Sequence, residues 1–232
     1  MGETTTITAA GGSFSAYLAR PEKPKAAAVV VIQEIFGVNQ VMRDLTDAYA
    51  AAGYLAICPD LFWRIEPGID ITDKTDAEWK RAFELFNAFD VDKGVKDLGA
   101  TIAHARADRT CSGPVGAVGY CLGGLLAFLT ATRTDVDAAV GYYGVGIDQR
   151  LGEAKTLVTP LLLHIADEDQ FVPKPAQAAI LEALNKASNA EIFTYPGRDH
   201  AFARPGGAHY DEMDAARAEA RTLAFFRGHL FR

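Results

Sequence analysis

Apolar runs of strand length alternate along the chain with stretches of helical spacing. Strands are predicted at 26–32, 54–58, 115–120, 138–143, 160–166 and 190–195, and the continuous apolar run 26–32 is typical of a central strand covered on both faces. Helices are predicted at 39–52, 122–132, 174–187 and 210–230, with two more inside 77–107 that separate near 90–94. Strands that alternate with helices call for right-handed crossovers. The pattern therefore predicts an α/β fold with a doubly wound, mostly parallel sheet.

The segment before the first apolar run predicts an antiparallel hairpin. Residues 3–9 and 13–19 alternate or carry β-branched side chains around Gly11-Gly12. The loop 61–76 carries aromatic and charged residues without a clear period, and loops of this length are usually functional or mobile. With 232 residues, of which 49% are apolar, the chain can bury one sizeable core, so we expect a single domain over 1–232.

Charge and cysteine content exclude several function classes. A net charge of -7 without a basic cluster argues against nucleic acid, and the apolar runs are too short to span a membrane. The N-terminus lacks the features of a secretory signal, so a cytoplasmic enzyme is expected. Cys58, Cys111 and Cys121 show no C-x-x-C spacing, which disfavours disulfides and a zinc site. We expect no metal, no other cofactor and a small-molecule substrate.

The stretch Gly119-Tyr120-Cys121-Leu122-Gly123-Gly124 joins a predicted strand to a predicted helix. In that setting G-x-C-x-G is the thiol version of the G-x-S-x-G nucleophile elbow, whose glycines permit a tight turn. A sulfur at the start of a helix also faces unpaired N–H groups and the positive end of the helix dipole, which stabilise a thiolate. Cys121 is therefore the candidate nucleophile. The alternative is a buried structural cysteine beside packing glycines.

A cysteine nucleophile needs a base within reach and an acid that orients the base. An acidic loop at 167–173 follows one predicted strand, and a loop at 196–202 with one histidine follows the next. This is the chain order of α/β-hydrolases. We select Asp169 as the acid and His200 as the base; each alone could be an ordinary solvated or capping loop residue. The remaining histidines have no metal-ligand spacing and are interpreted as structural: His104, His164, His209 and His229.

Six segments spread over nearly the whole chain resemble the dienelactone hydrolase (carboxymethylenebutenolidase) family, a cysteine-dependent branch of the α/β-hydrolases. They are Gln33–Asn39, Cys58–Leu61, Gly119–Gly124, Gly141–Gly144, Asp169–Pro173 and His200–Arg204. The resemblance implies an α/β-hydrolase fold and a triad of Cys121, Asp169 and His200. It also implies an accessory role for Glu34, which is thought to hold or receive the thiol proton in the family.

The resemblance assigns substrate contacts as well. Arg204 matches the family arginine that pairs with the substrate carboxylate, a contact that suits a planar guanidinium. An ungapped alignment puts Trp79 where the family carries a second such arginine. Arg81 lies two positions further along the helix, on the opposite face, and takes that place only if the loop shifts register. Trp79, Phe83 and Phe86 are either ordinary core or the lining of a pocket for a bulkier or less anionic substrate.

These residues together predict a mechanism. The Cys121 thiolate attacks an enol-lactone or activated ester, the backbone N–H groups of Leu122 and Ile35 hold the oxyanion, and water activated by His200 releases the acid from an acyl-enzyme. Phe36 and Tyr143, within matching segments, are expected to contact substrate. We expect a monomer or weak dimer. The rivals are a general esterase or thioesterase, a thiol redox sensor and a non-catalytic binding protein.

Overall fold

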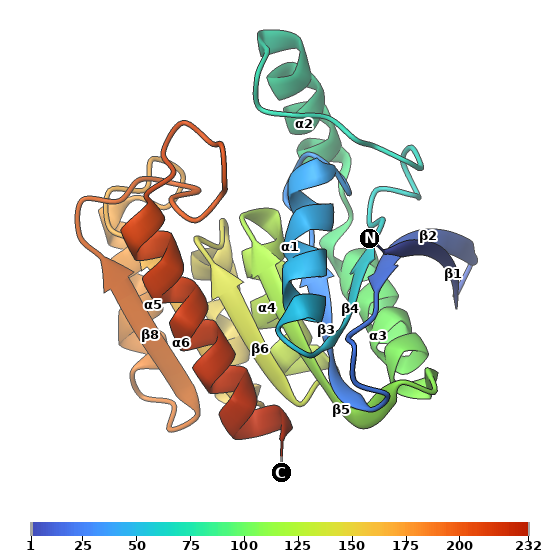
Figure 1. Ribbon diagram of the computed structural model, residues 1–232. Helices are drawn as coiled ribbons and strands as arrows, with labels where there is room; N and C mark the ends of the chain where they lie inside the picture. The colour runs from blue at the N-terminus through green and yellow to red at the C-terminus, as the bar shows by residue number, and fades with distance from the viewer. Residues whose placement is uncertain (1, 232) are drawn as a thin grey trace. The chain divides into compact units, whose positions relative to one another are not determined.

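The computed structural model describes residues 2–231 (Figure 1). The chain divides into two compact units, the first ending at Ala117 and the second beginning at Val118. The expectation of a single domain stays a prediction.

The first unit contains the N-terminal hairpin and two central strands. β1 (Glu3–Ala9) pairs antiparallel with β2 (Gly12–Ala19), which pairs antiparallel with β4 (Leu55–Pro59). β4 pairs in parallel with β3 (Ala26–Ile32), and every residue of β3 is buried. The hairpin predicted from residues 3–19 and the central strand predicted at 26–32 are therefore confirmed.

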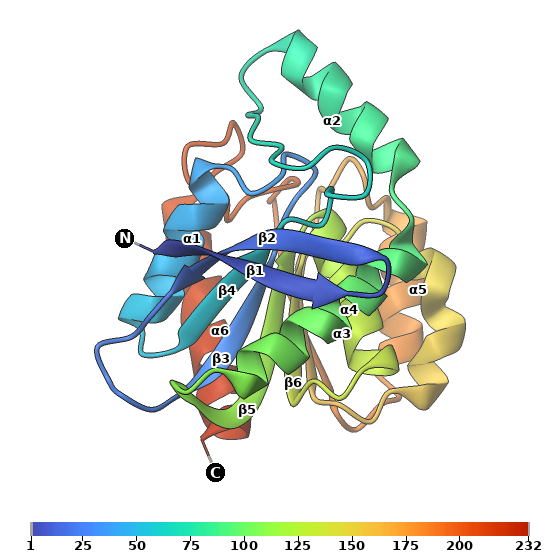
Figure 2. The ribbon, with the colours of Figure 1, turned by 90° about the vertical axis from the view of Figure 1, so that its right-hand side faces the viewer.

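Three helices complete this unit: α1 (Gln40–Ala51), α2 (Asp76–Ala88) and α3 (Val91–Ala107). Each begins after a polar residue whose side chain accepts a hydrogen bond from the third N–H beyond it: Asn39, Thr75 and Asp90, respectively. α1 and α3 cover opposite faces of β3 and β4, and α2 projects away from these strands (Figure 2). The caps fix where each helix begins and therefore which of its side chains face inward.

β5 (Cys111–Tyr120) runs across the division, and the second unit continues with β6 (Ala138–Tyr142), β7 (Leu161–Ala166) and β8 (Ala190–Tyr195). β6, β7 and β8 pair in parallel in that order. Their helices are α4 (Leu122–Arg133), α5 (Lys174–Leu184) and α6 (Glu212–Leu230), with a 3₁₀ helix η1 (Ile147–Thr156). α6 covers one face of these strands, and α4 and α5 cover the other (Figure 1). Loops that follow β6, β7 and β8 therefore emerge at one edge.

The predicted strands and helices are present, with corrections at their ends. The helix break falls at Phe89 and Asp90, and Gly94 lies inside α3, where an added Cβ would meet the Phe89 ring at 2.4 Å. β5 begins at Cys111, four residues before the predicted strand, and the helix predicted at 174–187 ends at Leu184. Helix η1 was not predicted, because a 3₁₀ helix leaves no 3.6-residue period. Among residues 2–231, no helix is long and apolar enough to cross a membrane.

Candidate active site

Cys121 lies at the sharp turn between β5 and α4. Its φ of 57° is in the left-handed region, which costs a non-glycine residue energy and often marks a functional site. The backbone N–H of Cys121 donates to the carbonyl of Tyr142 at 3.1 Å, which attaches the turn to the end of β6. A Cβ on Gly119 would lie 1.9 Å from the Gly123 carbonyl oxygen, so the turn requires glycine there. The predicted strand, tight turn and helix are confirmed.

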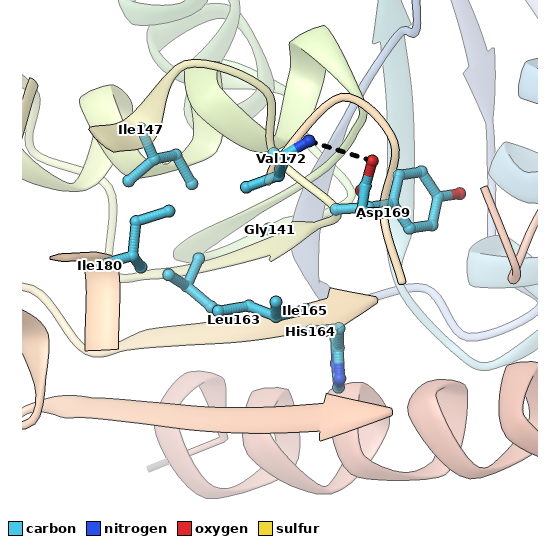
Figure 3. Close-up of a pocket in the computed structure, with 10 residues that line it drawn as sticks. Gly141, Ile147, Leu163, His164, Ile165, Asp169, Val172 and Ile180 are labelled. Carbon is cyan, nitrogen blue, oxygen red and sulfur yellow. Dashed lines mark hydrogen bonds between the residues drawn. The ribbon is translucent and has the colours of Figure 1, made fainter. Parts of the chain in front are cut away.

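The predicted acid and base lie together. His200 Nδ1 is 2.9 Å from Asp169 Oδ2, and both side chains are buried, with 7% and 1% of their surfaces exposed. The other carboxylate oxygen of Asp169 accepts hydrogen bonds from the N–H groups of Phe171 at 2.8 Å and Val172 at 3.2 Å (Figure 3). Asp169 is thus held on both oxygens, and one of them faces the imidazole.

Cys121 is the second partner of this imidazole. Burial alone lowers the pKa of His200, but the charge of the Cys121 sulfur and the hydrogen bonds to Asp169 and Cys121 outweigh it and raise the pKa to about 10. The ring is also enclosed edge-on by Tyr143 and Phe171, with centroids 5.0 and 4.9 Å away. A pKa of about 10 keeps the His200 imidazole protonated at neutral pH.

Behind Asp169 lies a cavity of about 10 Å³, lined by apolar side chains that include Ile147, Leu163 and Ile180 (Figure 3). A space of this size holds at most one water molecule, so it cannot take a substrate. His164 lines the same region, but its ring points away from the cavity toward α6 (Figure 3). The cavity therefore adds no ligand-binding capacity to the site.

Two further residues predicted for the site belong to the second unit. Leu122 is the first residue of α4, so its N–H has no acceptor within the helix and suits an oxyanion donor. Arg204 is 8% exposed, and its backbone N–H donates to the carbonyl of Ala201 at 2.9 Å, which closes a turn. Ala201, directly after His200, has a left-handed φ of 62°. The base is therefore flanked by a conformationally constrained segment.

The remaining predicted residues belong to the first unit. Glu34, Ile35 and Phe36 follow β3 and are all buried. The ring of Phe36 meets Trp79 of α2 edge-on with 5.1 Å between centroids, and Trp79 stacks on Phe83 at 5.7 Å. We call Phe36, Trp79 and Phe83 the aromatic cluster. Phe83 is 41% exposed, so the cluster reaches the surface of this unit and is not ordinary core throughout.

Arg81 lies away from the aromatic cluster. Its guanidinium pairs with Glu66 at 2.5 Å and with Glu84 at 3.1 Å, on a surface where all three side chains are substantially exposed. Trp79 instead donates its indole N–H to the carbonyl of Asp73 at 3.0 Å. Of the two residues considered for the family arginine position, Trp79 is the one that packs against Phe36.

Sequence reasoning missed two residues that contact His200. Phe171 packs edge-on against the imidazole, and Asp199 accepts the backbone N–H of His200 at 2.6 Å. Asp199 directly precedes His200 and Phe171 lies two positions after Asp169, and this proximity in sequence was the available signal. Within residues 2–231 no group of three or more His, Cys, Asp or Glu side chains could hold a metal ion.

The strand order, the helices on both faces and the left-handed turn before α4 define an α/β-hydrolase fold. The model of the dienelactone hydrolase family matches residues 14–230, and the chain belongs to this family. A carboxymethylenebutenolidase of Pseudomonas putida is 40% identical over 215 residues, covering 93% of this chain and 91% of the relative. A provisionally named one from Azospirillum brasilense is 53% identical over 221 residues, covering 94% and 95%.

A solved structure supports membership of the same family. A provisionally named dienelactone hydrolase of Klebsiella pneumoniae superposes with a TM-score of 0.87 at 30% identity and covers 99% of both chains. The chain is therefore a hydrolase that acts on ester or lactone bonds of a small molecule.

Proposed function

We propose that the protein opens enol-lactones through a thioester intermediate, with Cys121 as nucleophile, His200 as acid and base, and Asp169 as the residue that orients the ring. The observation that carries the proposal is the 2.9 Å contact between His200 Nδ1 and Asp169, with the Cys121 sulfur as a second hydrogen-bond partner of the same ring. A nucleophile, a base and an orienting carboxylate in this relationship suit acyl transfer.

In the first step the Cys121 sulfur anion attacks the lactone carbonyl and forms a C–S bond. The N–H of Leu122 supports the oxyanion of the tetrahedral intermediate. When the ring C–O bond breaks, the departing enol oxygen takes the proton that His200 carries at neutral pH. The leaving group stays attached to the acyl chain, because the lactone is cyclic.

In the second step His200, now neutral, removes a proton from water. The hydroxide attacks the thioester carbonyl, the C–S bond breaks, and the sulfur anion and imidazolium are restored as the carboxylic acid leaves. Asp169 accepts from Nδ1 throughout, so the other ring nitrogen remains the one that exchanges protons. No step needs a redox partner or a metal.

Roles for two residues of the first unit rest on the sequence alone. The resemblance assigns Glu34 to the thiol proton, and Ile35 is the predicted second oxyanion donor. Both are buried at the end of β3, as expected for residues that follow a central strand. Both roles stay predictions. The role of Glu34 is tested by Glu34→Gln, in which we expect kcat to fall.

The relatives named carboxymethylenebutenolidase and the buried guanidinium of Arg204 support a carboxylate-bearing enol-lactone as substrate. A second candidate is a general esterase activity on neutral, aromatic esters. The aromatic cluster favours it, because α2 directs Trp79 rather than Arg81 toward Phe36. Both candidates use the same nucleophile.

The test compares cis-dienelactone, trans-dienelactone and a neutral nitrophenyl ester with the wild-type enzyme and Cys121→Ala. We expect Cys121→Ala to lose essentially all turnover of every substrate, and intact-mass spectrometry to detect an acyl adduct only when Cys121 is present. Cys111→Ala is the matched control, since Cys111 is a buried cysteine at the other end of β5. Unaltered turnover in Cys121→Ala would falsify the proposal.

A further inference from the structure

The loops that carry Asp169 and His200 are joined to each other by hydrogen bonds. In the backbone, the N–H of Asp167 donates to the carbonyl of Tyr195 at 3.1 Å, and the N–H of Glu168 donates to the carbonyl of Arg198 at 2.7 Å. These two bonds continue the pairing of β7 with β8 past the ends of the strands. They stop one residue short of Asp169 and two residues short of His200.

The side chain of Asp199 continues the connection beyond that point. Its Oδ1 accepts the backbone N–H of His200 at 2.6 Å and the backbone N–H of Gln170 at 3.1 Å. Its Oδ2 lies 3.4 Å from the side-chain amide of Gln170 and 3.6 Å from His209 Nδ1. One carboxylate thus binds the residue that follows Asp169 and the backbone of His200 itself.

The carboxylate is in its charged form. Burial raises the pKa of Asp199, but hydrogen bonds from the His200 and Gln170 N–H groups and the nearby charges of His209 and His200 outweigh it and lower the pKa overall. Charge-assisted bonds to backbone N–H groups are short and roughly twice as strong as neutral ones. The connection between the two loops is therefore strong despite the partly exposed position of Asp199.

The loop around His200 needs such a connection. Gly197 and Ala201, on either side of His200, both have left-handed φ angles, of 73° and 62°. An alanine in that region is strained, and the conformation persists only where the surroundings impose it. Arg198 ties the same loop to Asp214 at 2.8 Å and to Asp211, but both partners lie at the start of α6, not in the loop of Asp169.

We propose that Asp199 is a positioning residue that holds the loop of Asp169 and the loop of His200 in the register that their 2.9 Å hydrogen bond requires. The inference rests on the proposed function for its effect on catalysis. Its geometric part concerns only the two loops, and can be tested without turnover. A displacement of about 1 Å between catalytic groups can reduce rate by about a hundredfold, so a residue that touches no substrate can still control kcat.

The experiment compares Asp199→Ala with Asp199→Asn in the full chain. Asparagine keeps an oxygen that can accept both backbone N–H groups, whereas alanine removes the acceptor. For Asp199→Ala we expect a tenfold to hundredfold fall in kcat on the best lactone or ester of the substrate panel, with KM changed less than twofold. Asp199→Asn should keep at least a third of wild-type kcat. Glu168→Ala is the control, because that exposed carboxylate is in the same loop and pairs with Lys174.

A proton NMR measurement separates positioning from chemistry. The far-downfield resonance of the His200 Nδ1 proton should be present in wild type, Asp199→Asn and Glu168→Ala, and shifted or broadened in Asp199→Ala. Wild-type kcat in Asp199→Ala, or equal losses in the alanine and asparagine variants, would overturn the proposal. If Asp199→Ala does not fold, Asp199→Ser supplies the test, because its short hydroxyl cannot reach both N–H groups, and a wild-type resonance and kcat there overturn it. If Cys121→Ala stays active while the resonance still depends on residue 199, the proposed function fails and the positioning role stands.

Discussion

The Nδ1 atom of His164 lies 2.8 Å from the hydroxyl oxygen of Tyr195, in the interior between β7 and β8. The other ring nitrogen lies 3.0 Å from the hydroxyl of Thr222 in α6, which is itself 2.7 Å from the hydroxyl of Tyr142. Burial, and then the positive charge of Arg221, lower the pKa of His164 to about 3. This histidine is neutral in the folded protein and belongs to a buried hydrogen-bond network, as the structural interpretation expected.

Acid should therefore destabilise the protein through His164. The folded state holds this ring neutral, while the unfolded chain takes up a proton below its ordinary pKa of about 6.5. Its contribution to stability is present above about pH 6.5 and is lost as the pH falls toward the folded value of about 3. In this window the free energy of unfolding should fall more steeply in wild type than in His164→Asn, by about 1.4 kcal/mol per pH unit.

Urea unfolding at a series of pH values measures this difference. His209→Asn is the control, because His209 has a side chain that is 43% exposed. Parallel pH profiles for wild type and His164→Asn would show that the ring is protonated in the folded state.

Arg204 should distinguish anionic from neutral substrates. In Arg204→Ala we expect kcat/KM for a carboxylate-bearing lactone to fall at least tenfold, with a smaller loss for a neutral nitrophenyl ester, because the lost contact is charge-assisted. Arg204→Lys should recover only part of the loss, since an ammonium cannot form the bidentate contact. Arg217→Ala removes an exposed arginine paired with Asp214 and should leave kcat/KM unchanged for both substrates. Equal losses of kcat/KM on both substrates in Arg204→Ala would show that Arg204 does not bind the substrate carboxylate.

The aromatic cluster, and not Arg81, should affect substrate preference. Arg81→Ala breaks exposed ion pairs, which contribute little because solvent screens them, so kcat/KM should stay within twofold for every substrate. Trp79→Ala removes the ring that contacts both Phe36 and Phe83, and should raise KM for aryl esters severalfold. Steady-state kinetics on aryl and alkyl esters make the comparison. A larger change in kcat/KM in Arg81→Ala than in Trp79→Ala would show that Arg81, and not Trp79, contacts the substrate.

The turn at Cys121 should not tolerate a methyl group at Gly119. The added Cβ would overlap the backbone carbonyl of Gly123, which cannot move without disturbing the first turn of α4. We expect Gly119→Ala to lower the free energy of unfolding by more than about 2 kcal/mol and to abolish activity. Gly152→Ala is a matched substitution at a glycine whose Cβ would meet nothing within 4 Å, and it should be close to neutral. Thermal unfolding of both variants provides the measurement.

Much of the site was predictable because segments of strand length precede its residues. The strands before Cys121 and Asp169 are largely apolar, whereas the strand before His200 contains Glu191 and Thr194. Chain order nevertheless placed the three site residues after separate strands. The structure brings the three side chains together, but their catalytic roles remain predictions. Asp169 was selected before the family resemblance was considered, and the resemblance implied the same residue. Backbone periodicity could not support that selection, because it does not determine which loop carboxylate reaches a ring.

Other features depend on contacts that no periodicity encodes. Trp79 packs against Phe36, whereas Arg81 pairs with exposed carboxylates. An ungapped alignment could not decide between Trp79 and Arg81, because it carries no information on these contacts. Asp199 resembles any polar loop residue in the sequence; its two N–H partners come from separate loops whose spacing depends on how β7 and β8 end. Helix η1 has neither an apolar period nor a side-chain cap.

The boundary at residues 117 and 118 has a consequence for how enzymes of this kind can diversify. The aromatic cluster lies entirely before it, whereas Cys121, Asp169, Asp199 and His200 lie entirely after it. A chimera of two family members with its crossover inside β5 would inherit the predicted triad and Asp199 from one parent and α2 from the other. Recombination at that strand could therefore exchange α2 between family members while the hydrogen bonds between the loops of Asp169 and His200 stay those of a single parent.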